Sequence, residues 1–467
     1  MIIERHMRRR ISVALLLLLW TAFAARAQDW RSGTDSRIEL MSILFRLAGN
    51  KEYHQCRIPA YDKAIDSYFA PYRDHEAVRL ARSLGVGFDA PMKLAVYVRD
   101  AKSLDELVPF DRQGVHLFQN WNAAKAREFL SAARRFAADT NFQSFLKSQQ
   151  PLFDATNTRL QTFIEKADLG WFTRFFAPPS PARLVVIAGM ANGASSYAVH
   201  LVDGPAAQES YAIPGVSKVD PEGLPVFDSA WRTTMVHELT HVYANVPIKA
   251  MAPMEKAVRQ IYESVAPAMQ RQSYGNWRTV LNESLSRAAT IEYVREHDGP
   301  EAARVVIRQE NSRSFFWMSG LVNLLGTYRN SREQYPTFDS FLPRVTEYFN
   351  GVAPRMHELT DRLQPKVVST SIQDGARGVD PGVKTMVVRF SMPMNKAGPF
   401  KDSKLNGGRF DQTGTVLTIP VTLEPARDYV FPLRWSGGQP LVSADGVPLA
   451  AALLRFHTGA ASSPKQK

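Results

Sequence analysis

The segment His237-Glu238-Leu239-Thr240-His241 contains the residue types of a zinc site at the spacing that such a site requires. Residues four apart leave a helix on the same face, one turn apart, so that the imidazoles of His237 and His241 can reach a single ion. Glu238 lies beside them, where a carboxylate can take a proton from a water molecule. The chemistry predicted is therefore metal-assisted hydrolysis. Because H-E-x-x-H also arises by chance, the prediction depends on the elements that surround it.

A helix is predicted over about residues 229–245. At 100° per residue, the three polar residues of the motif share one arc with Ala230, Thr234 and Asn245. The opposite arc is apolar and consists of Trp231, Met235, Val236, Leu239, Val242 and Tyr243. Such a helix can be anchored on one side and present ligands on the other. Either Asp228 or Ser229 can cap its first turn.

A catalytic zinc site takes three protein ligands and leaves the fourth position for water. Metzincins supply the third ligand from a longer motif, but this sequence has Ala244 and Pro247 where that motif has Gly and His, which excludes the class. Asn282-Glu283 instead resembles the second helix of gluzincins, the thermolysin-like peptidases. The resemblance implies that Glu283 is the third ligand. Glu263 is the alternative, nearer in sequence but without the preceding Asn.

The segment after Glu283 differs from the gluzincin pattern at one place. Gluzincins have an acidic residue one turn after the ligand, which accepts a hydrogen bond from a metal-binding histidine; this sequence has Arg287. The partners of the metal-binding histidines are therefore left open. Small side chains nearby allow the two site helices to approach closely: Ser284, Ser286, Ala288 and Ala289.

The reaction expected is hydrolysis of a peptide bond with one zinc ion as the cofactor. Zinc would supply an activated water and polarise the scissile carbonyl, and Glu238 would act as general base and return the proton to the leaving amine. A further donor usually stabilises the oxyanion. The candidates are Tyr293, Tyr328 and Tyr335, with His297 beside them in sequence, and the sequence does not choose among them.

The first residues predict export. Arg8 to Arg10 precede an apolar run from Ile11 to Ala25, which ends in the small-x-small triplet Ala25-Arg26-Ala27. We expect a signal peptide over residues 1–27 and a mature protein in the bacterial periplasm or outside the cell. The run is shorter than the roughly 20 residues of a membrane-spanning helix, and no second run follows, so no stable membrane span is expected.

The distribution of charge bears on the binding partners, and the number of cysteines bears on disulfide formation. Removal of residues 1–27 takes away five Arg and one Glu, which lowers the formal net charge from +12 by 4 to +8. The remaining Lys and Arg residues are scattered rather than gathered in a block, which argues against a nucleic-acid partner. The single cysteine, Cys56, cannot form an intramolecular disulfide and is interpreted as a buried thiol.

The 467 residues predict an α+β fold of more than one domain. A mostly helical, zincin-like metallopeptidase domain is expected over residues 28–364. Within it, β-favouring runs at 183–190 and 195–202, separated by Ala191-Asn192-Gly193, predict a β-hairpin before the motif helix. The edge of that hairpin could bind an extended peptide substrate by strand addition.

The character of the sequence changes at Lys366. Short β-rich runs predict a small sandwich over residues 366–460, with strands at 385–390, 415–421, 429–435 and 453–457. Residues 461–467 are expected to be a disordered tail. Gly375 to Pro381 and Arg389 to Met394 resemble the opening of bacterial immunoglobulin-like domains, which implies a spacer or adhesive module. The alternative is a β-lobe that packs on the catalytic domain.

From about Ile38 to Arg362 the chain is similar to a family of bacterial exported proteins, domain of unknown function 4932, which are expected to be metallopeptidases. The residues that carry the resemblance are Ile65 to Phe69, Asp74 to Val78 and the motif helix. We therefore expect an exported zinc peptidase. The alternative is a catalytically inactive zinc-binding or cell-surface ligand-binding protein, which would have no need for Glu238 between the two histidines.

Overall fold

The computed structural model describes residues 30–84, 89–112, 122–178, 183–201, 209–245, 248–397, 400, 403–435, 438–450 and 452–460. The predicted signal peptide and C-terminal tail lie outside these residues. The chain divides into two compact units, residues 1–243 and 244–467. The fold is of the mixed α+β kind that the sequence predicts, and no helix among the described residues is long and apolar enough to cross a membrane.

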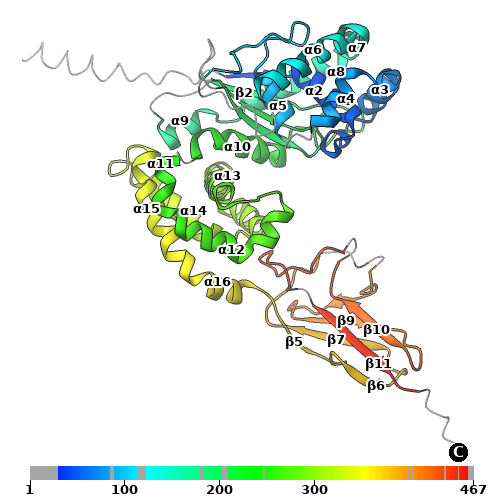
Figure 1. Ribbon diagram of the computed structural model, residues 1–467. Coiled ribbons are helices and arrows are strands. Elements are labelled where there is room, and N and C mark those ends of the chain that lie inside the picture. The colour runs from blue at the N-terminus through cyan, green and yellow to red at the C-terminus, as the bar shows by residue number, and fades with distance from the viewer. Residues whose placement is uncertain are drawn as a thin grey trace, which may run out of the picture. The chain divides into compact units, whose positions relative to one another are not determined.

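The first unit is built around the buried helix α2 (Ser36–Ala48), which begins where the Asp35 side chain accepts a hydrogen bond from the Arg37 amide. Helices α4 and α5 pack against α2. The helices of this unit are mostly amphipathic, as predicted: α3 (Pro59–Phe69), α4 (Glu76–Leu84), α5 (Ala90–Val96), α6 (Ala123–Asp139), α7 (Phe142–Ser148), α8 (Gln150–Glu165) and α9 (Gly170–Phe176) (Figure 1).

The sheet of the first unit has four strands in the order β1-β2-β4-β3. Strand β2 (Arg183–Ile187) pairs in parallel with β1 (Trp30–Gly33) and β4 (Glu209–Pro214). Strand β3 (Ser196–His200) pairs antiparallel with β4 and is an edge of the sheet that the described residues form. The prediction of a hairpin between residues 183–190 and 195–202 is therefore wrong: both strands exist, but β4 lies between them.

The segment between β2 and β3 contains turns and is also held by contacts with neighbouring elements. The Gly189 amide donates to the Pro214 carbonyl oxygen (3.0 Å), and the Ser42 hydroxyl donates to the Asn192 side-chain oxygen (2.9 Å). Gly193 has a φ of +59°, and a Cβ there would lie 1.8 Å from the Gln55 carbonyl oxygen. The segment is fastened to neighbouring elements, which leaves room for the fully buried strand β4 beside β2.

The motif helix is α10 (Ser229–Ala244), within one residue of the prediction. The Asp228 carboxylate caps it by accepting hydrogen bonds from the amides of Ala230 and Trp231 (both 3.1 Å). The Trp231 indole nitrogen donates to the Gly215 carbonyl oxygen just after β4 (3.1 Å), which ties the helix to the sheet. The predicted apolar face is buried at Trp231, Met235, Val236 and Leu239.

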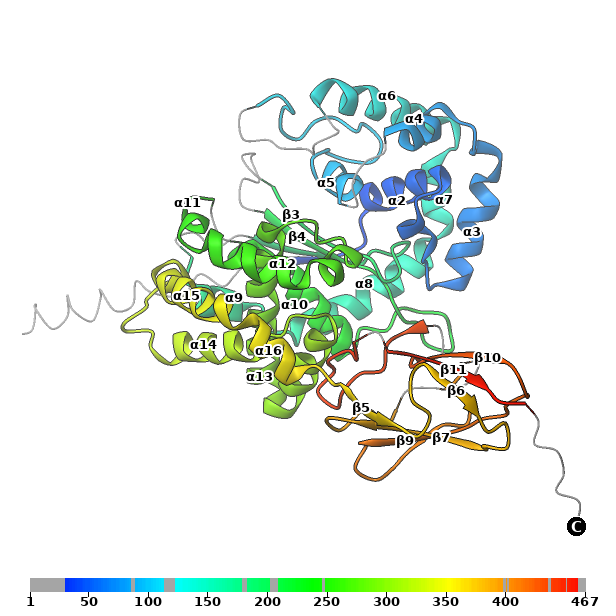
Figure 2. The same ribbon diagram turned by 60° about the horizontal axis from the view of Figure 1, so that its bottom comes forward.

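The helices of the second unit are α11 (Ile248–Met251), α12 (Glu255–Arg271), α13 (Trp277–Ser312), α14 (Met318–Asn330), α15 (Phe338–Val352) and α16 (Met356–Leu363). Helix α13 packs against α12 and α14, and α15 packs against the same two helices (Figure 2). The Asn276 side chain caps α13. The helix is broken at Gly299, where φ is 87° and ψ is 172°, immediately before Pro300.

The C-terminal part of this unit is a β-sandwich of two sheets, in the orders β10-β11-β6 and β5-β7-β9-β8 (Figure 1). The strands are β5 (Val367–Thr370), β6 (Ala376–Val379), β7 (Thr385–Phe390), β8 (Arg409–Phe410), β9 (Val416–Pro420), β10 (Asp428–Pro432) and β11 (Leu453–Thr458). The four predicted strands correspond to β7, β9, β10 and β11. Apolar side chains from both sheets, Met386 and Phe456 among them, form one core.

A turn of the sandwich packs on the C-terminal half of α13. The Asn311 side-chain nitrogen donates to the Asp445 carbonyl oxygen (3.3 Å). Gly446 has a φ of +82°, and a Cβ there would lie 2.1 Å from the Arg308 carbonyl oxygen. Only glycine permits this approach of the turn to the helix.

Candidate metal centre

The imidazoles of His237 and His241 face the same point from successive turns of α10. Their Nε2 atoms lie 3.2 Å apart, with the rings at 80° to each other. In a tetrahedral zinc site with Zn–N bonds of 2.0–2.1 Å, two nitrogens on the same ion are separated by about 3.4 Å. The spacing of the pair therefore fits two ligands of one ion.

Glu283, on the first half of α13, completes a group of three. Among the described residues, the ligand atoms of His237, His241 and Glu283 all lie within 4.8 Å of one another. The alternative third ligand, Glu263, is exposed on α12 and is not a member of this group. Of the two carboxylates that the sequence offers, the structure thus brings Glu283 to the histidines.

Glu238 is on α10 between the two histidines, and only 8% of it is exposed. It is not one of the three residues grouped as ligands. Glu238 is therefore a buried carboxylate next to the two histidines in the sequence of α10.

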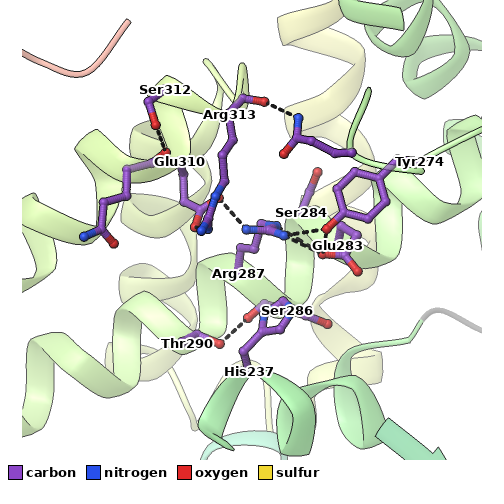
Figure 3. Close-up of polar contacts among 12 residues, drawn as sticks. His237, Tyr274, Glu283, Ser284, Ser286, Arg287, Thr290, Glu310, Ser312 and Arg313 are labelled. Carbon is purple, nitrogen blue, oxygen red and sulfur yellow. Dashed lines mark hydrogen bonds and ion pairs between the residues drawn. The ribbon is translucent and has the colours of Figure 1, made fainter. Parts of the chain in front are cut away.

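Tyr274 and Arg287 orient the Glu283 carboxylate. The Tyr274 hydroxyl donates to Glu283 Oε2 (3.2 Å), and the Arg287 guanidinium donates to the same oxygen (Nε, 3.1 Å). Arg287 also donates to the Tyr274 hydroxyl oxygen (2.7 Å), which closes a triangle (Figure 3). Both contacts with the carboxylate are made to Oε2.

A second carboxylate lies on the far side of Arg287. Arg287 Nη1 donates to Glu310 Oε2 (2.6 Å), and Arg313 donates to Glu310 Oε1 (2.8 Å), so that a chain of charges leads away from Glu283 (Figure 3). Arg287, which stands where the gluzincin pattern has an acidic residue, is thus a partner of Glu283.

The ionisation of this cluster follows from burial and neighbouring charge. Burial alone would lower the pKa of Arg287. The negative charges of Glu310 and Glu283 raise it by more than burial lowers it, so the pKa lies well above its ordinary value. Burial raises the pKa of Tyr274 to about 12, with Arg287 acting in the opposite direction. Tyr274 therefore keeps its proton at neutral pH and acts as a hydrogen-bond donor to Glu283.

The small side chains predicted beside Glu283 are buried at Ser284, Ser286, Ala288 and Ala289. The Ser284 hydroxyl accepts a hydrogen bond from the Trp317 indole nitrogen (3.0 Å) and donates to the Val280 carbonyl oxygen (2.6 Å). This turn of α13 is therefore fixed by the hydrogen bond from Trp317, the residue before α14, as well as by apolar packing.

The three tyrosines considered as oxyanion donors have packing contacts. Tyr293 stacks on His297 with ring centroids 3.9 Å apart. Tyr328 and Tyr335 both pack against Phe341, and burial raises the pKa of Tyr328 to about 12. A role in oxyanion stabilisation stays a prediction for each of them.

His75 has structural contacts. Its Nδ1 accepts a hydrogen bond from the Ala77 amide (3.1 Å) at the start of α4, and its Nε2 lies 3.2 Å from an oxygen of Asp139. The Cys56 thiol donates to the Met190 carbonyl oxygen (3.4 Å), and burial raises its pKa to about 12. Cys56 therefore remains a protonated thiol at neutral pH.

The fold and the site together define a mixed α+β protein with a two-histidine, one-carboxylate group on two helices. The chain belongs to the family described as Domain of unknown function (DUF4932), whose profile matches residues 33–347. The matched region includes both helices of the site. No curated protein matches the chain.

Two solved structures show limited similarity. One is a crystal structure of the S-layer protein rSbsC, with 14% identity and a TM-score of 0.17, covering 48% of this chain and 33% of that chain. The other is a structure of the surface layer protein SbsC, domains 1–6, with 14% identity and a TM-score of 0.16, covering 49% of this chain and 33% of that one. The aligned part spans about a third of the length of each of these two solved chains.

Proposed function

We propose that this protein is an exported zinc-dependent hydrolase, and specifically a peptidase of the gluzincin type with one zinc ion. The observation that carries the proposal is the pair of imidazole nitrogens 3.2 Å apart with the Glu283 carboxylate within 4.8 Å. Two histidines and one glutamate form the ligand set of thermolysin-like catalytic zinc sites, which keep the fourth position for water or substrate.

The residues present suit zinc chemically. Imidazole nitrogens and carboxylate oxygens are ordinary zinc ligands, and the 3.2 Å spacing is close to the edge of a zinc tetrahedron. When bound, zinc would supply Lewis acidity, which lowers the pKa of water and polarises a carbonyl group.

The proton transfers fall to Glu238. It takes a proton from the attacking water and gives it to the departing amine, so that one carboxylate serves both halves of the reaction. Because only 8% of Glu238 is exposed, the proton is passed between reactants with little exchange with bulk solvent.

Glu283 is held ready for the metal by Tyr274 and Arg287, which both donate to Oε2. Such outer partners restrict the rotation of a metal-binding carboxylate before the metal arrives. Tyr274 and Arg287 would therefore keep this carboxylate in place when zinc binds.

A peptide substrate binds by strand addition to β3, the edge strand of the four-stranded sheet. Among the described strands it pairs with β4 only, so its other side offers backbone groups to an extended chain. The chain itself occupies one backbone group at the end of this strand, because the Tyr97 hydroxyl donates to the His200 carbonyl oxygen (3.5 Å).

The proposal is tested by metal content and cleavage measured on the same four proteins. Wild type, Glu238→Gln and His357→Ala should each hold one zinc per chain, whereas His237→Ala should hold almost none. His357 is the matched control because its side chain is 91% exposed on α16. Cleavage of a mixed peptide library should occur with wild type and His357→Ala alone.

Two results would overturn the peptidase: a wild type that binds no zinc, or a Glu238→Gln variant that still cleaves. Stoichiometric zinc without cleavage of any peptide would favour the alternative, a zinc-binding protein without catalysis. Export is tested separately by N-terminal sequencing of the protein made in a bacterial host, for which a start near Gln28 is expected.

A further inference from the structure

A cavity lies wholly within residues 304–445 of the second unit and includes none of the three metal-binding candidates. Its volume is about 520 Å³, which falls within the roughly 300–1,000 Å³ of small-molecule sites. Side chains from α13, α14, α15 and α16 line it, and Asp445 of the sandwich closes one end.

One wall of the cavity is apolar and rigid. Phe316 and Trp317 are buried there, and Val352, Leu359 and Leu363 extend the apolar surface. The Tyr348 hydroxyl donates to the Trp317 carbonyl oxygen (2.5 Å), which fixes the tyrosine ring in place. A Cβ at Gly320 would lie 2.6 Å from the Tyr348 hydroxyl, so the glycine keeps this wall open.

The lining as a whole carries a net positive charge. Its charged residues are Arg304, Arg308, Arg355, Arg362, Glu358 and Asp445, four cations against two anions. Arg304 pairs with Glu301 and Arg355 with Glu358. Within the described part of the chain, Arg308 and Arg362 form no ion pair.

An arginine without a carboxylate partner next to an apolar wall selects for a particular chemistry. The guanidinium group matches a carboxylate with two parallel hydrogen bonds, and the aromatic wall accepts an apolar body. We propose that this cavity binds a small organic anion, whose carboxylate is held by Arg308 and Arg362 and whose apolar body lies against Trp317. The proposal is independent of the proposed peptidase activity.

The same chemistry has two sources, a free aliphatic or aromatic acid and the C-terminal carboxylate of a peptide. Isothermal titration with N-acetyl-phenylalanine, its neutral amide and octanoate separates them. Both carboxylates should bind, and the amide should bind at least about tenfold more weakly because it lacks the charge-assisted hydrogen bonds. The tighter of the two carboxylates identifies the source, the amino-acid derivative for a peptide end and octanoate for a free acid.

The variants locate the binding. Arg308→Gln/Arg362→Gln should weaken both carboxylates at least about tenfold. Arg344→Gln should leave them unchanged, because Arg344 pairs with Glu347 on α15 and does not line the cavity. All titrations are repeated in the His237→Ala background, where loss of the proposed zinc removes carboxylate binding at the metal.

Three outcomes would overturn the proposal: equal affinity for the acid and its amide, full affinity in the double variant, or no binding of either carboxylate at millimolar concentration. Loss of binding in the His237→Ala background would also overturn it, because the metal would then be the binding site. Should the double variant fail to fold by circular dichroism, Arg362→Gln alone decides, since Arg362 is exposed on α16.

Discussion

Buried carboxylates are accommodated differently in the two units of this molecule. Glu39, in the first unit, is 1% exposed and accepts hydrogen bonds from the Tyr61 hydroxyl (2.6 Å) and the Met190 amide (3.2 Å). Within the described residues it has no ion-pair partner. Burial raises its pKa to about 7, although both hydrogen bonds act in the opposite direction.

In the second unit, Glu283 and Glu310 share one buried guanidinium. Arg287 lies 3.0 Å from an oxygen of the first and 2.6 Å from an oxygen of the second. Its positive charge offsets the cost of removing these carboxylates from water. A buried carboxyl group whose hydrogen-bond donors are neutral, such as Glu39, is thus favoured in its protonated form. Carboxylates that share a buried arginine, such as Glu283 and Glu310, are favoured in the charged form, which is the form that binds a cation.

The largest effect is expected from removing that arginine. Arg287→Met leaves two carboxylates without their shared cation and should lower the free energy of unfolding by about 3–5 kcal/mol. Arg344→Met, at an exposed arginine of α15, should change it by less than about 0.5 kcal/mol. Urea unfolding followed by circular dichroism measures both. A loss under about 1 kcal/mol for Arg287→Met would mean that the ion pairs are not what stabilises this region.

Glu39 should make stability depend on pH in the opposite sense to most acids. Its carboxyl keeps its proton in the folded state up to about pH 7, while in the unfolded chain it ionises near its model value of 4.5. Stability is therefore expected to fall by roughly 3 kcal/mol as pH rises between these values and then to level off.

Glu39→Gln should remove this fall while other titrations remain. The measurement is the difference in urea midpoint between pH 5 and pH 8 for the two proteins. Equal differences in wild type and variant would show that Glu39 is ionised in the folded protein across this range, and the contrast between the two units would disappear.

A smaller effect is expected at Tyr274. Tyr274→Phe removes the hydroxyl that donates to Glu283 and should weaken zinc binding about tenfold. Stability of the metal-free protein should fall by about 1 kcal/mol. Tyr335→Phe is the control, because that ring packs on Phe341. Competition with a zinc chelator measures the affinities, and an unchanged value for Tyr274→Phe would exclude it as a positioning residue.

The smallest effect is expected at the N-terminus of α10, which is capped by the partly exposed side chain of Asp228. Asp228→Ala removes the side-chain cap and should cost about 1 kcal/mol. Ser229→Ala, at the other cap considered from the sequence, should cost less than half as much. Thermal unfolding of the two variants compares them, and the reverse order would assign the cap to Ser229.

The local parts of the site could be predicted from the sequence, and the distant parts could not. The i, i+4 spacing places His237 and His241 on one helix face whatever the rest of the fold. The pairing of β2 with β4 depends on segments some 25 residues apart, and no local pattern encodes it. The predicted hairpin was wrong for that reason.

The cluster behind Glu283 illustrates the same limit. Arg287 could be recognised as a departure from the gluzincin pattern, but its partners could not be identified. Tyr274 precedes the helix, and Glu310 follows Arg287 by 23 residues, beyond the break at Gly299. Only the folded arrangement of α13 and the segment before it brings these groups together.

The contact between the sandwich and α13 leaves no room for a side chain at position 446. Because even one methyl group would collide with the Arg308 backbone, Gly446→Ala is sterically incompatible with this contact between the turn and α13. A single added carbon at this position would therefore force the turn and the helix backbone apart.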